Sequence, residues 1–576
     1  MVTRLAARVP RPLRRVSLAR DFSRARGGNV VILFAFLSLP MLALAGAAID
    51  YGFATRLATK LQANVDATSL LLCQTPLTTT SAALNTLAQT TMVGAMGATV
   101  VVDPLVITSN PRQITLTARI PSQSFFGKFT GTTAITPAVG VQCATPLPKT
   151  FEIALVLDNT GSMAASSGGQ SKLDAAKTAA ANFVDYVYSS PSFSSATKIA
   201  IVPFAASVAV NPATYRYASW IDQTGKSSLH WTNVLSPSTA GFTSRFDVFT
   251  ALQSAYSGWG WGGCLETLPY PLNVQDGAPT PSNKDSYYVP LFAPDEPGDG
   301  STSYGAYTVG WNTRYSFNSY IDDSNGTSSC PALSSSTSFL NAEGRACKYK
   351  NPRDASPTSY NGYTGVPNGP NYGCTSQPLL RLTNDTTTLK ATINSMVPLG
   401  STNIHEGFMW GWRTISPNSV FADGSAYSPS SSSASASTIN KIIILMTDGT
   451  NSWATNPNAP ENGSMYFSMG YFTNADTSTP NPRLPSANQN VSDTASSRAA
   501  LDALTAQACS NAKAVNISIY TIGFSVSSDP IDATGQTLLR NCASSSNQFF
   551  IANDSSGLIS VFNQIAASIG ALRLTK

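Results

Sequence analysis

Three short segments of the chain carry oxygen-bearing side chains that could hold a hard metal ion. The first segment, DNTGSM at residues 158–163, directly follows an apolar run. Its alternate residues Asp158, Thr160 and Ser162 can converge on one point, because Gly161 permits the chain to turn there. One carboxylate and two hydroxyls favour Mg²⁺, Mn²⁺ or Ca²⁺ and disfavour zinc and copper.

Two later segments offer further ligands of the same kind. GSTNI at residues 400–404 opens a helical pattern, and TDG at residues 447–449 ends an apolar run. Ligand sites in open α/β sheets lie at the carboxyl ends of the strands, so a common location for the three segments is physically consistent. The sequence therefore predicts a divalent-cation site, with Mg²⁺ the favoured ion. Its expected ligands are Asp158, Thr160, Ser162, Thr402 and Asp448.

The elements that would position these ligands alternate between apolar runs and amphipathic helical patterns. Strands are predicted at residues 151–157, 198–204, 441–446, 517–522 and 549–552. Helices are predicted at residues 173–188, 389–396, 404–415, 495–515 and 558–572. This alternation is typical of an α/β fold with a doubly wound, mostly parallel sheet covered on both faces.

Two long stretches, residues 206–385 and 450–490, interrupt this pattern. The first is too long for a structureless loop in a compact domain, and we interpret it as an inserted subdomain stapled by disulfides. Four cysteines allow three pairings, and the sequence does not choose between them. These cysteines are Cys264, Cys330, Cys347 and Cys374. The stretch also holds Trp220, Trp231, Trp259, Trp261 and Trp311. We interpret these as its core, with a surface that stacks on sugars or protein partners as the alternative.

A membrane anchor precedes these elements. Residues 29–49 contain no charged side chain and are long enough to span a bilayer as a helix, with a local kink expected at Pro40. Residues 1–28 hold eight arginines and one acid, a net charge of +7, so the positive-inside rule predicts a cytoplasmic tail and an exported bulk. A cleavable signal peptide ending near residues 43–45 is the alternative. Eight cysteines without a CxxC pair fit disulfides in an oxidising compartment.

Residues 50–147 predict a small α+β unit with a pilin-like layout. The helical pattern continues over residues 51–73, and short strands are expected at residues 99–102, 105–108 and 113–119. Cys73 ends the helix and Cys143 ends the last strand, so a disulfide between them would close this unit.

The three ligand segments, in this order, resemble the metal-ion-dependent adhesion site of von Willebrand factor A (vWA) domains. The resemblance implies a vWA domain built from residues 148–205 and 386–576. It implies that Asp158, Thr160 and Ser162 are the first-loop ligands, although the family usually has Ser where this chain has Thr160. In that family the ion keeps an open position, which an acidic group of the partner often fills.

The anchor segment carries a second resemblance. RGGN at residues 26–29, followed by FAFLSLPMLALAGAAIDYG, is similar to the TadG-like members of the tight-adherence (Tad/Flp) pilus-assembly proteins. This implies a single-pass inner-membrane protein with its bulk in the periplasm or at the cell surface. Such a protein would assemble, anchor or display a pilus, with pilins or other assembly proteins as partners. The C-terminal segment of the chain is also similar to that of these proteins, and this similarity implies a Cys509–Cys542 disulfide.

Several functional classes lack support in the sequence. The rest of the chain carries a charge of −2 once the basic tail is set aside, so no nucleic-acid partner is expected. No GxSxG, P-loop or HExxH motif is present, and His405 is expected to fill a loop or capping role rather than act as a base. We therefore expect binding rather than catalysis. The alternatives are a surface adhesin without a pilus role and an enzyme whose site lies in residues 206–385.

Overall fold

The computed structural model describes most of the chain beyond the basic tail. It describes residues 29–570 apart from 77, 110–111, 128–133, 145–148, 168, 298–317, 322–329, 332, 334–336, 353–365, 428–438 and 457–460. The predicted cytoplasmic tail at residues 1–28, most of the linker before residue 149, and Trp311 lie outside the described residues. The chain forms two compact units, one before and one after residue 148.

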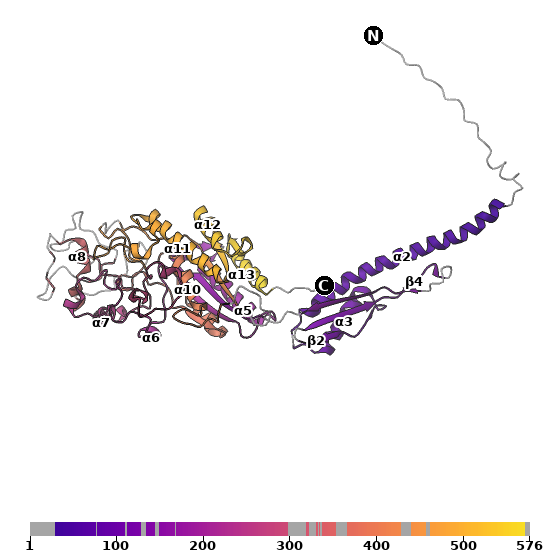
Figure 1. The fold of residues 1–576 in the computed structure, drawn as a ribbon, viewed down its shortest axis with the longest axis horizontal. Coiled ribbons are helices and arrows are strands. Elements are labelled where there is room, and N and C mark those ends of the chain that lie inside the picture. Colours follow the sequence, from indigo (N-terminus) through magenta and orange to yellow (C-terminus); the bar gives the residue numbers. More distant parts are fainter. Residues whose placement is uncertain are drawn as a thin grey trace, which may run out of the picture. The chain divides into compact units, whose positions relative to one another are not determined.

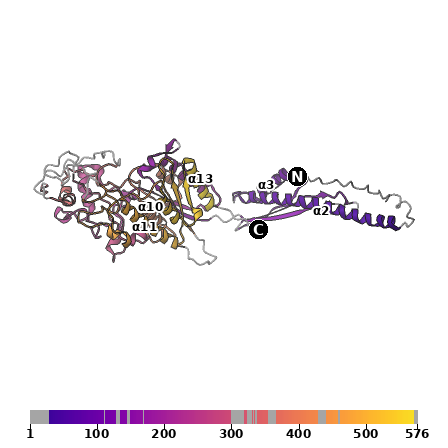
Figure 2. The same ribbon diagram turned by 90° about the horizontal axis from the view of Figure 1, so that it is seen from above.

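The first unit is organised by one long helix, α2 (Asn29–Cys73), and Pro40 lies inside this helix. By length and composition this helix could cross a membrane. Its later part packs Leu61, Val65 and Leu72 against an antiparallel sheet, whereas the large apolar side chains before residue 45 are exposed. The strands are β1 (Val101–Val102), β2 (Val106–Thr108), β3 (Gln113–Arg119), β4 (Ser122–Gln123), β5 (Ala134–Ile135) and β6 (Ala138–Ala144). Figures 1 and 2 show α2 extending beyond this sheet.

A second helix of this unit, α3 (Ser81–Met96), was not predicted from the sequence. Only Leu84, Ala88 and Met92 form its buried stripe, and the rest is mostly small or polar, so its apolar periodicity is weak. Cys73 and Cys143 form the predicted disulfide, which joins the end of α2 to β6.

The second unit is built on a six-stranded sheet. Its strands, in spatial order, are β11 (Leu380–Thr383), β10 (Lys198–Phe204), β7 (Phe151–Asp158), β12 (Asn440–Thr447), β13 (Ser518–Phe524) and β14 (Phe549–Ala552). Neighbouring strands are parallel except for the edge pair β10 and β11. In chain order the arrangement is 3-2-1-4-5-6, that of doubly wound α/β sheets. The predicted mostly parallel sheet is therefore confirmed.

Helices cover both faces of this sheet. On β7, Ile153 and Leu155 face one hydrophobic cluster and Ala154 and Val156 face another. The first face is covered by α5 (Lys172–Ser189), α9 (Thr386–Ser395) and α13 (Ser555–Ile569). The second face is covered by α10 (Ile404–Ile415), α11 (Thr494–Ala514) and α12 (Ala533–Cys542). The sheet is thus buried on both sides, as its continuous apolar strands require.

Much of the long stretch between β10 and β11 packs on the second face, where many of its apolar side chains belong to the same cluster as α10 and α11. A smaller, separate cluster joins other side chains of this stretch to Tyr466 and Tyr471. It contains α6 (Pro212–Tyr215), α7 (Arg245–Ala255) and α8 (Phe339–Gly344). Trp259 and Trp261 are buried, and Trp220 and Trp231 pack against the same cluster, which supports the interpretation of these tryptophans as core.

Buried ion pairs and disulfides fix this stretch. The Glu266 carboxylate pairs with the guanidinium groups of Arg245 and Arg483, and Arg483 comes from the other long stretch, residues 450–490. The four cysteines pair as Cys264–Cys374 and Cys330–Cys347. The two long stretches of the sequence are therefore joined to one another in space.

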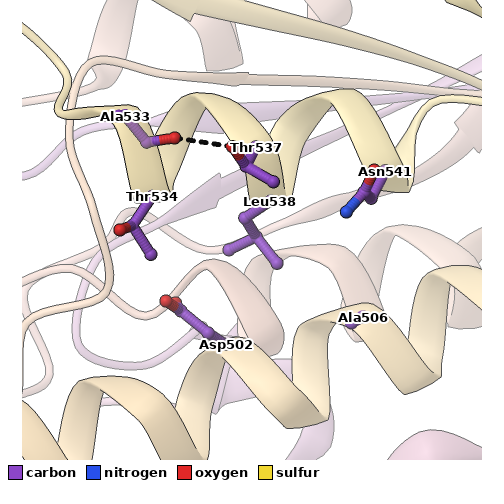
Figure 3. A pocket seen from close by; sticks show the side chains of 7 residues that line it. All are labelled: Asp502, Ala506, Ala533, Thr534, Thr537, Leu538 and Asn541. Carbon is purple, nitrogen blue, oxygen red and sulfur yellow. Dashed lines mark hydrogen bonds between the residues drawn. The ribbon is translucent and has the colours of Figure 1, made fainter.

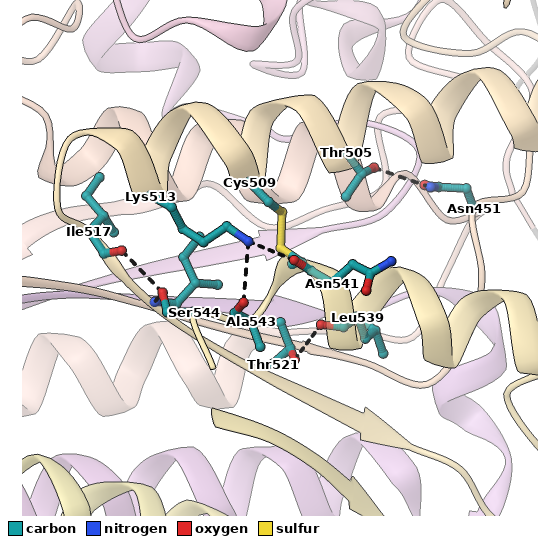
Figure 4. Close-up of a disulfide and its surroundings, with 12 residues drawn as sticks. Asn451, Thr505, Cys509, Lys513, Ile517, Thr521, Leu539, Asn541, Ala543 and Ser544 are labelled. Carbon is teal, nitrogen blue, oxygen red and sulfur yellow. Dashed lines mark hydrogen bonds between the residues drawn. A yellow bond between two sulfur atoms is a disulfide. The ribbon is translucent and has the colours of Figure 1, made fainter. Parts of the chain in front are cut away.

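One strand of the large sheet and one helix that covers it were missed by the sequence patterns. β11 lies inside the range 206–385 that we assigned to the insertion, because LRLT is short and only half apolar. α12 has the polar sequence ATGQTLLRNC, with few buried side chains. The Cys509–Cys542 disulfide implied by the resemblance joins α11 to α12, and Lys513 Nζ beside it donates to the Asn541 carbonyl at 2.7 Å (Figure 4).

Close packing of α10 on the sheet gives a first testable prediction. A Cβ added at Gly411 would lie 2.3 Å from Cγ2 of Val156. We expect Gly411→Ala to lower the free energy of unfolding by about 1–3 kcal/mol, because overpacking forces side chains out of their rotamers. Gly277→Ala, where nothing lies within 4 Å of the added Cβ, is the control for calorimetric unfolding. Equal stability of the two variants would contradict the close approach.

Candidate metal centre

The carboxylate of Asp158 lies at the carboxyl end of β7, the strand at which the chain order of the sheet reverses. It is fully buried. Its Oδ1 accepts from the Thr160 backbone N–H at 2.8 Å, and its Oδ2 accepts from the Thr447 hydroxyl at 2.6 Å. Asp158 is thus held by its own loop and by the neighbouring strand β12, at the crevice where doubly wound sheets bind their ligands.

The hydroxyls of the same loop connect Asp158 to the next strand. Thr160 Oγ1 and Ser162 Oγ lie 3.0 Å apart, and Ser162 Oγ donates to Asp448 Oδ1 at 2.8 Å. Asp448 follows β12 and is buried, whereas Ser162 is exposed. The structure therefore brings Asp158, Thr160, Ser162 and Asp448 together at one sheet edge.

The third predicted segment, residues 400–404, lies beside the other two. The Gly161 N–H donates to the Gly400 carbonyl at 2.9 Å, and Gly400 has a φ of 92°, which favours glycine. Thr402 Oγ1 lies 3.8 Å from the position of a Cβ added at Gly449, so its hydroxyl lies next to the TDG segment. The Thr402 carbonyl accepts from the Ser452 N–H, which further ties the two loops together.

A buried lysine belongs to this group of side chains and was not predicted. Lys172, the first residue of α5, has a fully buried ammonium group. Its Nζ lies 2.9 Å from Asp448 Oδ2 and 2.7 Å from Asp529 Oδ2. Asp529 follows β13 and is half exposed. Lys172 thus places a positive charge directly beside one of the predicted metal ligands.

Burial sets the charge states at this edge. It raises the pKa of Asp158 to about 7, with repulsion from Asp448 adding to the effect and hydrogen bonds from Thr447 and Thr160 opposing it. Burial also raises the pKa of Asp448, against the attraction of Lys172 and the hydrogen bond from Ser162. For Lys172 burial opposes the charged form, but Asp448 and Asp529 outweigh it and raise the pKa. Both carboxylates would therefore gain from a further positive charge nearby.

Two oxygen separations at this edge, which are those of ordinary hydrogen bonds, are also compatible with a small divalent ion. The separations of 2.8 Å (Ser162 to Asp448) and 3.0 Å (Thr160 to Ser162) match the edge of about 3 Å expected for an octahedron with Mg–O bonds of about 2.0–2.1 Å. Within the described ranges, no group of three or more Asp, Glu, His or Cys side chains is placed to hold an ion. A cation at this edge would therefore depend on hydroxyl oxygens as well as the two carboxylates.

Other polar groups near this face take structural roles. His405 is buried on α10, and its Nε2 lies 2.8 Å from the carbonyl oxygen of Asn273. Burial lowers the pKa of His405, which favours a neutral ring. A pocket of about 420 Å³ lies between α11 and α12 (Figure 3). Of the residues that line it, only Asp502 is charged, and its Oδ1 accepts from Asn451 Nδ2 at 2.7 Å. Neither feature forms a nucleophile–base pair.

A family comparison concerns the first unit. Residues 28–71 match the Tad family model described as "Flp pilus-assembly TadE/G-like". The matched residues are the apolar run and the following part of α2, so the resemblance seen in the anchor segment is confirmed. No curated protein matches the chain.

Comparison with solved structures found pilus proteins with low overall similarity. The vWF domain of the type V pili tip protein Mfa5 from Porphyromonas gingivalis is 12% identical, covers 75% of this chain and 99% of that chain, and has a TM-score of 0.31. The adhesive tip pilin GBS104 from Group B Streptococcus agalactiae is 11% identical, covers 73% and 100%, and has a TM-score of 0.31. The pilus adhesin SpaC from Lactobacillus rhamnosus GG is 10% identical and covers 82% and 34%, with a TM-score of 0.29, so this chain spans about a third of SpaC. Similarities at this level carry no argument about fold or function.

The raised pKa of Asp158 predicts a pH-dependent stability. Between its ordinary pKa of 3.8 and about 7, the folded protein keeps a proton that the unfolded chain has released. The free energy of unfolding should therefore fall as pH rises through this range. In EDTA we expect the Tm of the wild type to drop by a few degrees relative to Asp158→Asn between about pH 5 and pH 8.

The control is Asp185→Asn, which removes an exposed carboxylate near the far end of α5. Its Tm should stay parallel to that of the wild type over the same range. A constant difference between wild type and Asp158→Asn would show that Asp158 does not titrate in this way.

Proposed function

We propose that this protein is a membrane-anchored, extracytoplasmic vWA-type protein that assembles, anchors or displays a Tad/Flp-type pilus by metal-dependent binding of a partner. One observation carries the proposal. The side chains of Asp158, Thr160, Ser162 and Asp448 converge at the switch point of a 3-2-1-4-5-6 sheet, in a chain whose N-terminal segment matches a pilus-assembly family. The function is binding, so we assign no reaction.

The proposed ligands are the five residues predicted from the sequence, with Mg²⁺ as the favoured ion and Mn²⁺ or Ca²⁺ as alternatives. When bound, the ion supplies an open coordination position that a carboxylate of a pilin or another assembly protein can fill. Asp158 and Asp448 supply the negative charge, Thr160, Ser162 and Thr402 supply neutral oxygens, and the backbone of Gly400 positions the first loop. This division leaves the site able to accept an acidic group from outside.

Lys172 limits the negative charge that the site offers. Its ammonium neutralises much of the Asp448 carboxylate and orients it through Oδ2, leaving Oδ1 toward Ser162. The proposed site is therefore weaker for cations than one with two free carboxylates. It is also better suited to exchange an ion or a partner than to hold one permanently.

Export across the inner membrane is supported by the anchor and the cysteines. α2 exposes its apolar run, and the arginines precede that run, which favours a single-pass helix with a cytoplasmic N-terminus. All eight cysteines form disulfides, as expected in an oxidising compartment such as the periplasm or cell surface. The residues that would bind the ion then lie on the side where pilins assemble.

The metal site can be tested by calorimetric titration of Mg²⁺ and Mn²⁺ into the full-length protein. We expect saturable binding that is lost in the Asp158→Ala/Asp448→Ala double variant, because the two charged ligands are removed. Asp185→Ala, which breaks an exposed ion pair with Lys390, should bind like the wild type. Equal binding by wild type and double variant would contradict the proposed site.

Replacing Lys172 is expected to strengthen Mg²⁺ binding, whereas replacing the two carboxylates is expected to abolish it. Lys172→Met keeps the apolar stem and removes the positive charge beside Asp448, so Mg²⁺ should bind about tenfold more tightly or better. The same titration measures this, with unfolding in EDTA as a check that the fold persists. Weaker binding in Lys172→Met would indicate that Lys172 matters mainly by positioning Asp448.

A further inference from the structure

Exposed aromatic side chains gather where the apolar run of α2 ends. Tyr51 and Phe53 on α2 are 71% and 50% exposed, and Phe125, on the loop after β4, is 76% exposed. The ring centroids of Phe53 and Phe125 lie 5.6 Å apart. Phe53 and Phe125 together form an exposed apolar surface, whereas Tyr51 lies at the same level of α2 on another side of the helix, because residues two apart in a helix point in different directions.

A buried carboxylate holds the loop at this level of the helix. Asp50 is 6% exposed and accepts hydrogen bonds from the Ser124 hydroxyl, from the Phe125 N–H at 2.9 Å and from the Phe126 N–H at 3.0 Å. The Phe126 ring packs on Gly46, where an added Cβ would lie 2.7 Å from the ring. Gly46 and Asp50 are the only buried positions on α2 between residues 41 and 53.

The helix geometry places this surface at a bilayer boundary. The uncharged residues 29–49 form about 31 Å of helix at 1.5 Å per residue, close to the hydrocarbon thickness of about 30 Å. Asp50 is the first charged residue after this run, so the hydrocarbon should end at the level where the loop is held. Trp and Tyr are enriched at this depth, and Phe is among the apolar side chains that interfacial segments bury there.

We propose that the loop at residues 124–126 inserts Phe125 into the outer lipid interface, beside Phe53, while Asp50 holds the loop against the helix. The occupant of this surface is lipid, and the inference rests on the proposed membrane anchor. The aromatic surface is continuous with the lipid-facing side chains of α2. The hydrogen bonds to Asp50 let its charge sit at the interface without an unpaired oxygen facing the acyl chains. The loop would fix the depth and rotation of the first unit on the membrane.

The experiment uses the full-length chain with one added cysteine, labelled with an NBD fluorophore. The native cysteines are all paired, so the added thiol reacts alone. Labels at Leu39→Cys, Phe125→Cys and Val106→Cys report the apolar run, the loop and an exposed residue of β2. The protein is reconstituted into phosphatidylethanolamine–phosphatidylglycerol vesicles. Quenching by aqueous iodide is compared with quenching by a lipid that carries a shallow nitroxide.

We expect iodide to quench the Phe125 label at least about threefold less than the Val106 label, and the shallow nitroxide to quench Phe125 more, as for an interfacial side chain. A label at Phe53→Cys gives a second report from the helix if the loop variant does not fold. If the Leu39 label is shielded but Phe125 and Phe53 are quenched like Val106, the inference is overturned and the anchor stands. Quenching of Phe125 and Phe53 to the level of Val106 is also expected if a partner protein, absent from the vesicles, covers the surface in place of lipid. Iodide quenching of Leu39 itself would overturn the membrane anchor together with the inference.

Discussion

The buried carboxylate of Asp158 is the constraint on which the carboxyl edge of the large sheet depends. A charge removed from water must be compensated by hydrogen bonds or by an opposite charge. For Asp158 the hydrogen bonds come from the backbone of Thr160 and from the hydroxyl of Thr447 on the next strand. The same requirement extends to Asp448, which takes Ser162 and Lys172 as partners. Two loops that are distant in sequence are thereby held together, and backbone hydrogen bonds to Gly400 and Thr402 add the third loop. The geometry of the proposed site follows from this need for compensation.

The central part of the fold could be predicted because its strands are buried on both faces. Runs such as residues 153–157 and 442–446 are continuously apolar, and a carboxylate that follows such a run is expected at a strand end. Asp158 and Asp448 were found in this way, whereas Thr160 and Ser162 were found by their alternation with Asp158. Thr402 was found in the segment that opens a helix, and the other four ligands are linked by the hydrogen bonds described above. Edge elements lack this signal. β11 is paired on one side only, so its sequence does not need to be strongly apolar.

The residues that sequence reasoning missed are the partners rather than the ligands. Lys172 lies one residue before the predicted helix, and its burial depends on Asp448, 276 residues later. No local pattern carries that information. Asp529 follows β13, and the rule that placed Asp448 after β12 could have included it. In the first unit, α3 was missed because its buried stripe is only Leu84, Ala88 and Met92, and its other residues are mostly small or polar, a composition also found in loops.

The pairing of β7 with β12 has a consequence for how the protein reaches its folded state. The hydrogen bond between Asp158 and Thr447 joins residues separated by 289 positions. If the chain crosses the inner membrane in sequence order, as the proposed topology requires, β7 and β10 reach the far side long before β12, β13 and β14. Until residue 447 has crossed, one edge of β7 has no neighbour, and the aromatic stretch has only part of its packing surface. Folding with such high contact order is slow and leaves strands open to aggregation. Secretion of this protein would therefore place unusual demands on chaperones on the far side of the membrane.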